Sequence, residues 1–166
     1  MGALYKGSLN SSRPALRRYL GDNSAVIGIG DYVAEGTAGE AILATAGDRL
    51  LGVVVGFETK SGGQTDFDSG SLTDVTMAAD NQTVAQEKVV VDINPLSLNS
   101  IPLSAAAGTT TGSDKSGVSF ELTDHDTVNE ASVKTDGTAQ QLYSQGVDPN
   151  NSSNVIVSIA ESSLHR

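Results

Sequence analysis

The chain has 166 residues and a mass of 17.0 kDa, a size that fits one domain or one domain with a small appendage. It contains no cysteine, which excludes disulfides, thiolate catalysis and cysteine-ligated metal sites. Only 4% of its residues are aromatic and none is tryptophan, so a deep ligand pocket with aromatic walls is not expected. No apolar run approaches the roughly 20 residues that span a bilayer, so we expect neither a membrane span nor a membrane partner.

The net charge of −10 is distributed unevenly along the chain. Residues 1–18 carry Lys6, Arg13, Arg17 and Arg18 and no acid, whereas residues 19–166 carry the other 6 bases and all 20 acids, a net charge of −14. An acidic body argues against binding to nucleic-acid phosphates. The basic leader is interpreted either as an arm that docks on an acidic surface or as a frayed terminus.

Residues 1–23 show no sustained hydrophobic period. Pro14 restricts the residue before it to extended geometry, so we expect an extended arm, with a short helical turn over 15–20 as the alternative. Residues 24–57 consist of short apolar runs separated by glycine, which is typical of a sandwich or a small barrel. The strands expected in this stretch are 25–29, 32–33, 41–44 and 50–57.

The second half of the chain continues the same pattern. Residues 118–122 alternate strictly between polar and apolar, as a half-buried strand does. The stretch 138–147 is compatible with either a strand or a helical turn. Further strands are expected at 72–77, 87–93, 155–159 and 96–103, the last of them at a sheet edge. The intervening loops are expected at 61–70, 105–117 and 148–154.

These elements predict an all-β protein. We expect a small β-sandwich or β-barrel-like module over residues 24–166, with an extended basic arm over residues 1–23. The polar stretch near 61–71 or the low-complexity stretch near 105–117 could subdivide the module.

Three local patterns resemble binding sites. Residues 124–126 (DHD) offer metal-ligand atoms, but neighbours on a strand point to opposite faces, so a solvated turn is favoured. Residues 28–30 (GIG) lack the third glycine and the following helix of a dinucleotide site. Residues 66–70 (DFDSG) resemble part of a calcium loop without its remaining ligands, and weak calcium binding stays open. No pattern predicts a catalytic residue, a cofactor or a metal, so we expect a protein that is not an enzyme.

Several segments resemble small head proteins of tailed bacteriophages, in particular the capsid decoration (cement) proteins. They are residues 1–7 (MGALYKG), 26–33 (VIGIGDYV), 52–57 (GVVVGF), 146–151 (GVDPNN) and 155–159 (VIVSI). The resemblance implies a β-rich structural protein on the outer surface of the virion capsid that bridges copies of the major capsid protein. It also implies a homo-oligomer, a trimer or dimer, and it brings no catalytic residue.

Combined with the basic leader, this resemblance gives a set of candidate capsid-binding residues in the arm: Tyr5, Lys6, Arg13, Arg17 and Arg18. Two alternatives remain open. One is another virion component, such as a head fibre base or a tail protein. The other is a carbohydrate- or surface-binding β-module, which needs an aromatic platform that the four tyrosines, Tyr5, Tyr19, Tyr32 and Tyr143, would have to supply. Direct binding of nucleic acid is not expected.

Overall fold

The computed structural model describes residues 3–9, 14–59, 64–65, 74–104, 116–134 and 140–160. These residues form an all-β protein, which confirms the fold class expected from the sequence. The strands are β1 (Leu4–Ser8), β2 (Leu16–Leu20), β3 (Val26–Ile27), β4 (Tyr32–Glu35), β5 (Ala41–Leu43), β6 (Leu50–Glu58), β7 (Gln64–Thr65), β8 (Val75–Thr76), β9 (Lys88–Asp92), β10 (Ser97–Pro102), β11 (Ser119–Asp124), β12 (Thr127–Lys134), β13 (Leu142–Asp148) and β14 (Asn151–Ile159). One π-helical turn, η1 (Asn81–Ala85), precedes β9.

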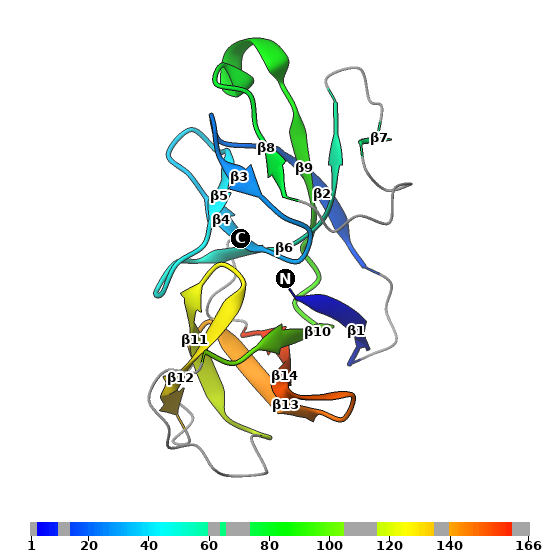
Figure 1. Ribbon diagram of the computed structural model, residues 1–166, viewed down its shortest axis with the longest axis vertical. Helices are drawn as coiled ribbons and strands as arrows, with labels where there is room; N and C mark the ends of the chain where they lie inside the picture. Colours follow the sequence, from blue (N-terminus) through cyan, green and yellow to red (C-terminus); the bar gives the residue numbers. More distant parts are fainter. Residues whose placement is uncertain are drawn as a thin grey trace.

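The strands build two lobes (Figure 1). The C-terminal lobe is one sheet in the order β1-β10-β14-β13-β11-β12. The central lobe is a sheet in the order β2-β9-β6-β4-β5, with β7 on β6, together with the two-stranded sheet β3-β8. Every strand pair in these sheets is antiparallel. Since β1 belongs to the C-terminal lobe, the central lobe is inserted between the first strand of that lobe and the rest of it.

Both large sheets curl toward closure. In the central lobe, Gly21 and Ala41 form a parallel bridge between the end of β2 and the start of β5. In the C-terminal lobe, Leu103 and Val128 form a parallel bridge just after β10, and Ser104 N–H donates to the Val128 carbonyl at 2.8 Å. Closure covers edges that would otherwise expose unpaired backbone groups. Each lobe is therefore barrel-like.

Local sequence explains the longest strand. In β6, Leu50 and Val53 pack into one core while Leu51 and Val54 pack into another. Strict alternation would put residues two apart on one face, and the spacing of three reflects the register shift of β6 on β4, where Val33 pairs with Gly52 and Ala34 with Leu50. Gly52 lies where β6 crosses β9, and a Cβ atom there would sit 2.1 Å from the carbonyl oxygen of Asp92. Only glycine permits this close approach of the two backbones.

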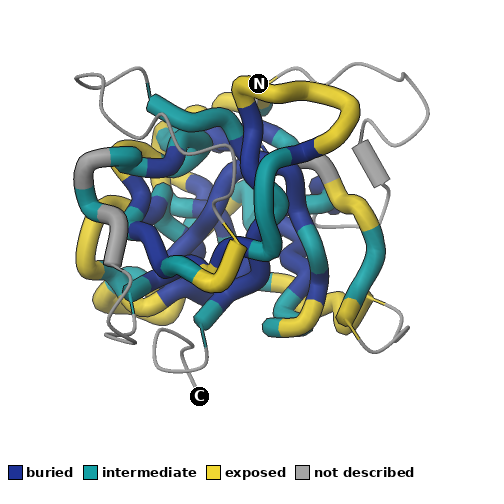
Figure 2. The backbone as a smooth tube through the Cα atoms, turned by 90° about the horizontal axis from the view of Figure 1, so that it is seen from below, coloured by how far each residue is buried: buried dark blue, intermediate teal, exposed yellow. Residues whose placement is uncertain are grey.

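One core is shared between the lobes. Tyr32, Ala34, Leu50 and Val53 of the central lobe pack in the same cluster as the interior of the C-terminal lobe. The C-terminal residues of this shared core are Ile101, Phe120, Leu122, Val128, Leu142, Val155, Val157 and Ile159. Figure 2 shows the buried segments running through the interior, with exposed segments at the turns. The second core lies within the central lobe around Ile27, Phe57, Met77 and Val89.

Polar contacts also join the lobes. Gln141 Nε2 donates to the carbonyls of Thr45 at 2.7 Å and Asp48 at 2.9 Å, while its Oε1 accepts from Leu122 N–H at 2.9 Å. The backbone N–H of Tyr32 donates to the carbonyl of His125 at 2.7 Å. The two lobes are therefore held together both by the shared apolar core and by hydrogen bonds between them.

The structure resolves one ambiguous stretch of the chain and differs from the sequence-based expectation at two others. The ambiguous stretch 138–147 contains β13, a strand. The expected loop 148–154 is wrong in its extent, because Asp148 pairs directly with Asn151 across a two-residue turn and β14 begins at Asn151. The expectation that 96–103 forms an edge strand is also wrong: β10 lies between β1 and β14.

The segment expected as an arm has its own arrangement. Its described residues are extended, but they pair within the two lobes: β1 with β10 and β2 with β9. The chain passes between the lobes twice, and the two crossings touch, since Leu9 N–H donates to the Leu96 carbonyl at 2.9 Å. The described residues before residue 24 are therefore part of the two lobes, and no separate arm is seen among them.

Candidate interaction surface

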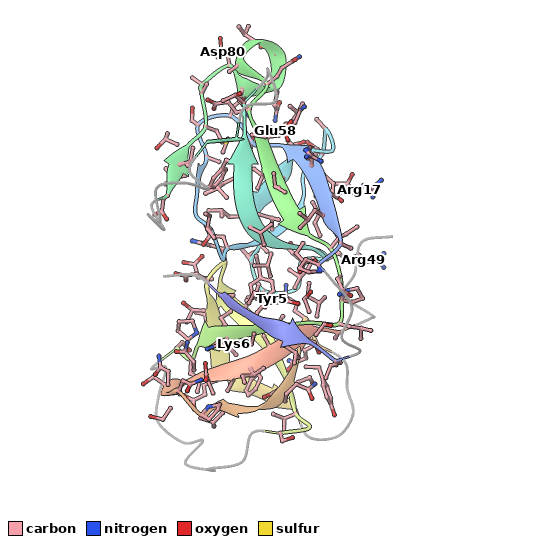
Figure 3. The ribbon with its side chains drawn as sticks, turned by 90° about the vertical axis from the view of Figure 1, so that its right-hand side faces the viewer. Tyr5, Lys6, Arg17, Arg49, Glu58 and Asp80 are labelled. Carbon is pink, nitrogen blue, oxygen red and sulfur yellow. The ribbon has the colours of Figure 1, made fainter. Side chains whose placement is uncertain are left out.

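Four of the five candidate capsid-binding residues lie on β1 and β2, and Figure 3 labels three of them, Tyr5, Lys6 and Arg17. Tyr5 and Lys6 belong to β1, and Arg17 and Arg18 belong to β2. Arg13 lies outside the described residues. These residues are close together in the sequence, but in the structure their side chains have different partners and different degrees of exposure.

Lys6 is engaged within the molecule. Its Nζ lies 3.1 Å from Oδ2 of Asp148, a carboxylate that is only 2% exposed. The same carboxylate accepts hydrogen bonds from Ser100 Oγ at 2.5 Å and from Asn150 N–H at 2.9 Å. The hydrogen bond from Ser100 is the largest cause that holds the pKa of Asp148 below its usual range, with Asn150 and Lys6 adding to it. Lys6 therefore fastens β1 to the β13–β14 turn, and its charge is largely neutralised.

Arg18 is also paired within its own lobe. Its Nε donates to Oε2 of Glu58 on β6, across the intervening strand β9. Lys88 Nζ lies 3.7 Å from the other oxygen of the same carboxylate. These cations, with the Arg18 hydrogen bond as the main cause, lower the pKa of Glu58. The Arg18 side chain is still 53% exposed, so the pair leaves part of the guanidinium open to a partner.

Arg17 is the exposed cation of β2. Its guanidinium carbon lies 5.9 Å from the centre of the Tyr19 ring, within the range of a cation–π contact. It has no ion pair with any other residue that the structure describes. Since Arg17 alternates with Arg18 along the strand, the two side chains point to opposite faces of β2.

Exposed apolar side chains accompany these cations. Tyr5 is 45% exposed, Leu9 51%, Leu16 54% and Leu96 37%. All four lie on β1, at the start of β2 or where the chain crosses between the lobes. We call Tyr5, Leu9, Leu16, Arg17 and Leu96 the N-terminal face, a set defined by its place on these segments; Leu16 and Arg17, neighbours on β2, point to opposite sides of that strand. Sequence reasoning found the cations and Tyr5 but not the leucines, because an exposed leucine has no local signature.

A second polar cluster lies at the lobe junction. Oδ2 of the buried Asp31 accepts from Gly28 N–H at 2.7 Å and lies 3.8 Å from His125 Nε2. His125 Nδ1 is 2.6 Å from Oδ1 of Asp124. Burial raises the pKa of Asp31, while Gly28 and His125 oppose the rise. The pKa of Asp124 is lowered, mainly by the hydrogen bond from the His125 backbone.

This cluster holds the junction together rather than opening into a site. His125 and Asp126 form the turn between β11 and β12, which confirms the turn expected from the sequence. Within the described ranges, no three His, Asp or Glu side chains are placed to hold one metal ion. The calcium-loop-like residues 66–70 lie outside the described residues.

The tyrosines do not converge on one platform. Tyr32 is fully buried in the shared core, and burial raises its pKa. Tyr5 lies in register with Asn99, Val157 and Ser144, whereas the exposed Tyr143 is the neighbour of Ser144 on β13. Successive residues of a strand point to opposite faces, so Tyr5 and Tyr143 belong to opposite faces of the sheet.

Among the described residues, no helix has the length and apolar character needed to cross a bilayer. Comparison of the chain with protein-family models, with curated proteins and with solved structures found no match.

Proposed function

We propose that this chain is a structural virion protein that decorates the outside of a tailed-phage capsid and bridges subunits of the major capsid protein. The observation that carries the proposal is the N-terminal face. On a molecule of net charge −10, exposed apolar side chains lie on β1, at the lobe crossings and at the start of β2, where Leu16 directly precedes the exposed cation Arg17. A surface with that composition fits a protein partner that buries the leucines and supplies carboxylates. The segments that resemble decoration proteins support the same conclusion.

The mechanical properties of the fold suit this role. A protein that bridges capsid subunits must resist separation, so its own parts must not move apart under load. The shared core and the contacts of Gln141 hold the lobes together. A homo-oligomer, as the resemblance implies, would multiply weak contacts through effective concentration. No chemical step is required.

The experiment is a binding assay with heads that lack this chain. Purified protein is added to them, and its occupancy is measured by sedimentation and by electron microscopy of the decorated particles. The wild type should add a protruding density of its own mass outside the shell. The Leu16→Glu variant should lower the occupancy about tenfold or more, because a charge then replaces an apolar contact in the interface.

Val84→Glu is the matched control, since Val84 is 60% exposed and lies on η1, away from the N-terminal face. It should bind as the wild type does. Binding to isolated tails and not to heads would contradict the proposal, and so would equal loss in both variants. Deletion of residues 2–18 is a poorer test, because it removes β1 and most of β2 and would damage both sheets.

A further inference from the structure

Among the described residues, no strand pairs with the edge of β2 that faces away from β9, and the register of β2 shows which backbone groups lie on that edge. Ile93 N–H donates to the Ala15 carbonyl at 2.8 Å, and Gly21 N–H donates to the Glu87 carbonyl at 3.2 Å. In antiparallel pairs, hydrogen-bonded positions alternate, so Arg17 and Tyr19 also direct their N–H and C=O groups toward β9. Leu16 and Arg18 therefore direct theirs outward. No described residue pairs with β2 at these two positions, since β5 reaches β2 only at Gly21.

An open edge of alternating donors and acceptors is recognised by a polypeptide backbone. Nucleic acid cannot pair with it, and the acidic body would repel phosphate. The positive charge on and beside β2 then favours a polypeptide segment that carries carboxylates. Arg18 and Lys88 share one carboxylate, Glu58, and Arg17 adds a cation that has no ion pair among the described residues, so the middle of this strand is basic on an acidic molecule. A second copy pairing β2 with β2 would bring these arginines against their own counterparts, which is unfavourable.

We propose that the edge of β2 at residues 16–18 binds an extended, carboxylate-bearing segment of a partner polypeptide as an added strand. The N–H and C=O groups of Leu16 and Arg18 pair with the backbone of that segment. Arg17 and the exposed part of Arg18 contact its carboxylates on the two faces of the strand. The proposal rests on the function proposed above for the identity of the partner, a capsid subunit, and on the geometry of β2 for the mode of binding.

The test compares two substitutions at one position in the head-binding assay. Leu16→Ala removes the exposed side chain and keeps the outward N–H. Leu16→Pro removes that N–H as well, while the hydrogen bond that Ala15 accepts from Ile93 stays intact. The Leu16→Pro variant should bind about tenfold more weakly than Leu16→Ala, because one backbone acceptor of the partner is left unpaired. Thermal unfolding of both variants checks that they are folded.

Charge is tested with a second pair. Arg17→Gln and Arg49→Gln change the net charge equally, but Arg49 lies in the turn that leads into β6 and not on β2 (Figure 3). Arg17→Gln should weaken binding about threefold to tenfold and make it less sensitive to salt. Arg49→Gln should bind as the wild type does.

A photo-crosslinking residue at position 16 identifies what lies on the edge, even if the proline variant does not fold. On decorated heads it should join this chain to a segment rich in Asp and Glu of a capsid subunit, and the same probe at Val84 should not. Crosslinks to a second copy, to another part of the same chain or to a segment without acids would overturn the inference. So would equal binding of Leu16→Ala and Leu16→Pro, with the proposed function still standing. If the wild type does not bind heads at all, the proposed function fails, and this inference fails with it.

Discussion

The buried carboxylate of Asp92 accepts a 2.6 Å hydrogen bond from the hydroxyl of Ser97 and so ties the last residue of β9 to the first residue of β10. Its other oxygen accepts from the backbone N–H of Ala15 at 2.9 Å and of Asn94 at 3.0 Å. Asp92 therefore joins both crossings of the chain between the lobes. A single carboxylate provides much of the local order at the point where the lobes connect.

Replacement of this carboxylate should be costly. We expect Asp92→Ala to lower the free energy of unfolding by about 2–4 kcal/mol, because it leaves buried donors unpaired. Ser97→Ala, which removes one partner and leaves the backbone contacts, should cost about 1 kcal/mol. Urea unfolding monitored by circular dichroism measures both. Equal stability of Asp92→Ala and the wild type would show that the crossings are held by other contacts.

The contacts of Asp148 with Ser100, Asn150 and Lys6 predict a loss of stability in acid. The pKa of Asp148 is lower in the folded state than in the unfolded chain, so its contribution is present above about pH 4 and disappears as the pH falls through the folded value. Asp148→Asn should flatten this part of the stability profile between about pH 5 and pH 2. Lys6→Met should cost about 1–2 kcal/mol at neutral pH. A profile of Asp148→Asn parallel to the wild type would contradict the assignment.

For Asp31 we expect the opposite dependence of stability on pH. Burial raises its pKa in the folded state, so the folded protein holds the proton more tightly and stability falls as the pH rises from the unfolded to the folded value. The neutral Asp31→Asn side chain can still accept from Gly28 N–H and carries no buried charge. The variant should therefore gain melting temperature relative to the wild type at pH 7, and less or none at pH 4. An increase in melting temperature that is the same at both pH values would contradict this explanation.

Two glycines with positive φ, Gly52 at +157° and Gly47 at +85°, differ in how closely another backbone approaches them. A Cβ atom at Gly52 would lie 2.1 Å from the Asp92 carbonyl oxygen, so Gly52→Ala must push β6 and β9 apart and should cost about 3 kcal/mol or more. Gly47 has open space around the position of a Cβ atom but a φ of +85°. Gly47→Ala should cost only about 1–2 kcal/mol. Calorimetry on both variants gives the comparison, and a reversed order would mean that the strands can separate freely.

Much of the fold class follows from local features of the chain. The valines between Gly52 and Gly56, and the apolar run 155–159, favour strands because β-branched side chains suit a pleated and buried surface. The alternation over 118–122 likewise predicts β11, and the turn residues of 124–126 predict its hairpin. These inferences hold because each depends on residues within a few positions of one another.

The architecture and the interaction surface depend on contacts between distant residues. The backbone of Leu4 pairs with that of Ser100, and the side chain of Lys6 forms an ion pair with Asp148. The residues next to Leu4 and Lys6 in the sequence do not predict either partner. The charges of the leader are visible in the sequence, but only the register of β2 on β9 decides that Arg18 reaches Glu58 and that the backbone N–H and C=O of Leu16 point away from β9. Propensity and turn chemistry are local, so the sequence alone predicts the strands that an apolar run or an alternation marks, whereas β12 is not expected and 138–147 stays ambiguous. Strand order, barrel closure and the identity of the free edges arise from long-range packing, and only the tertiary structure decides them.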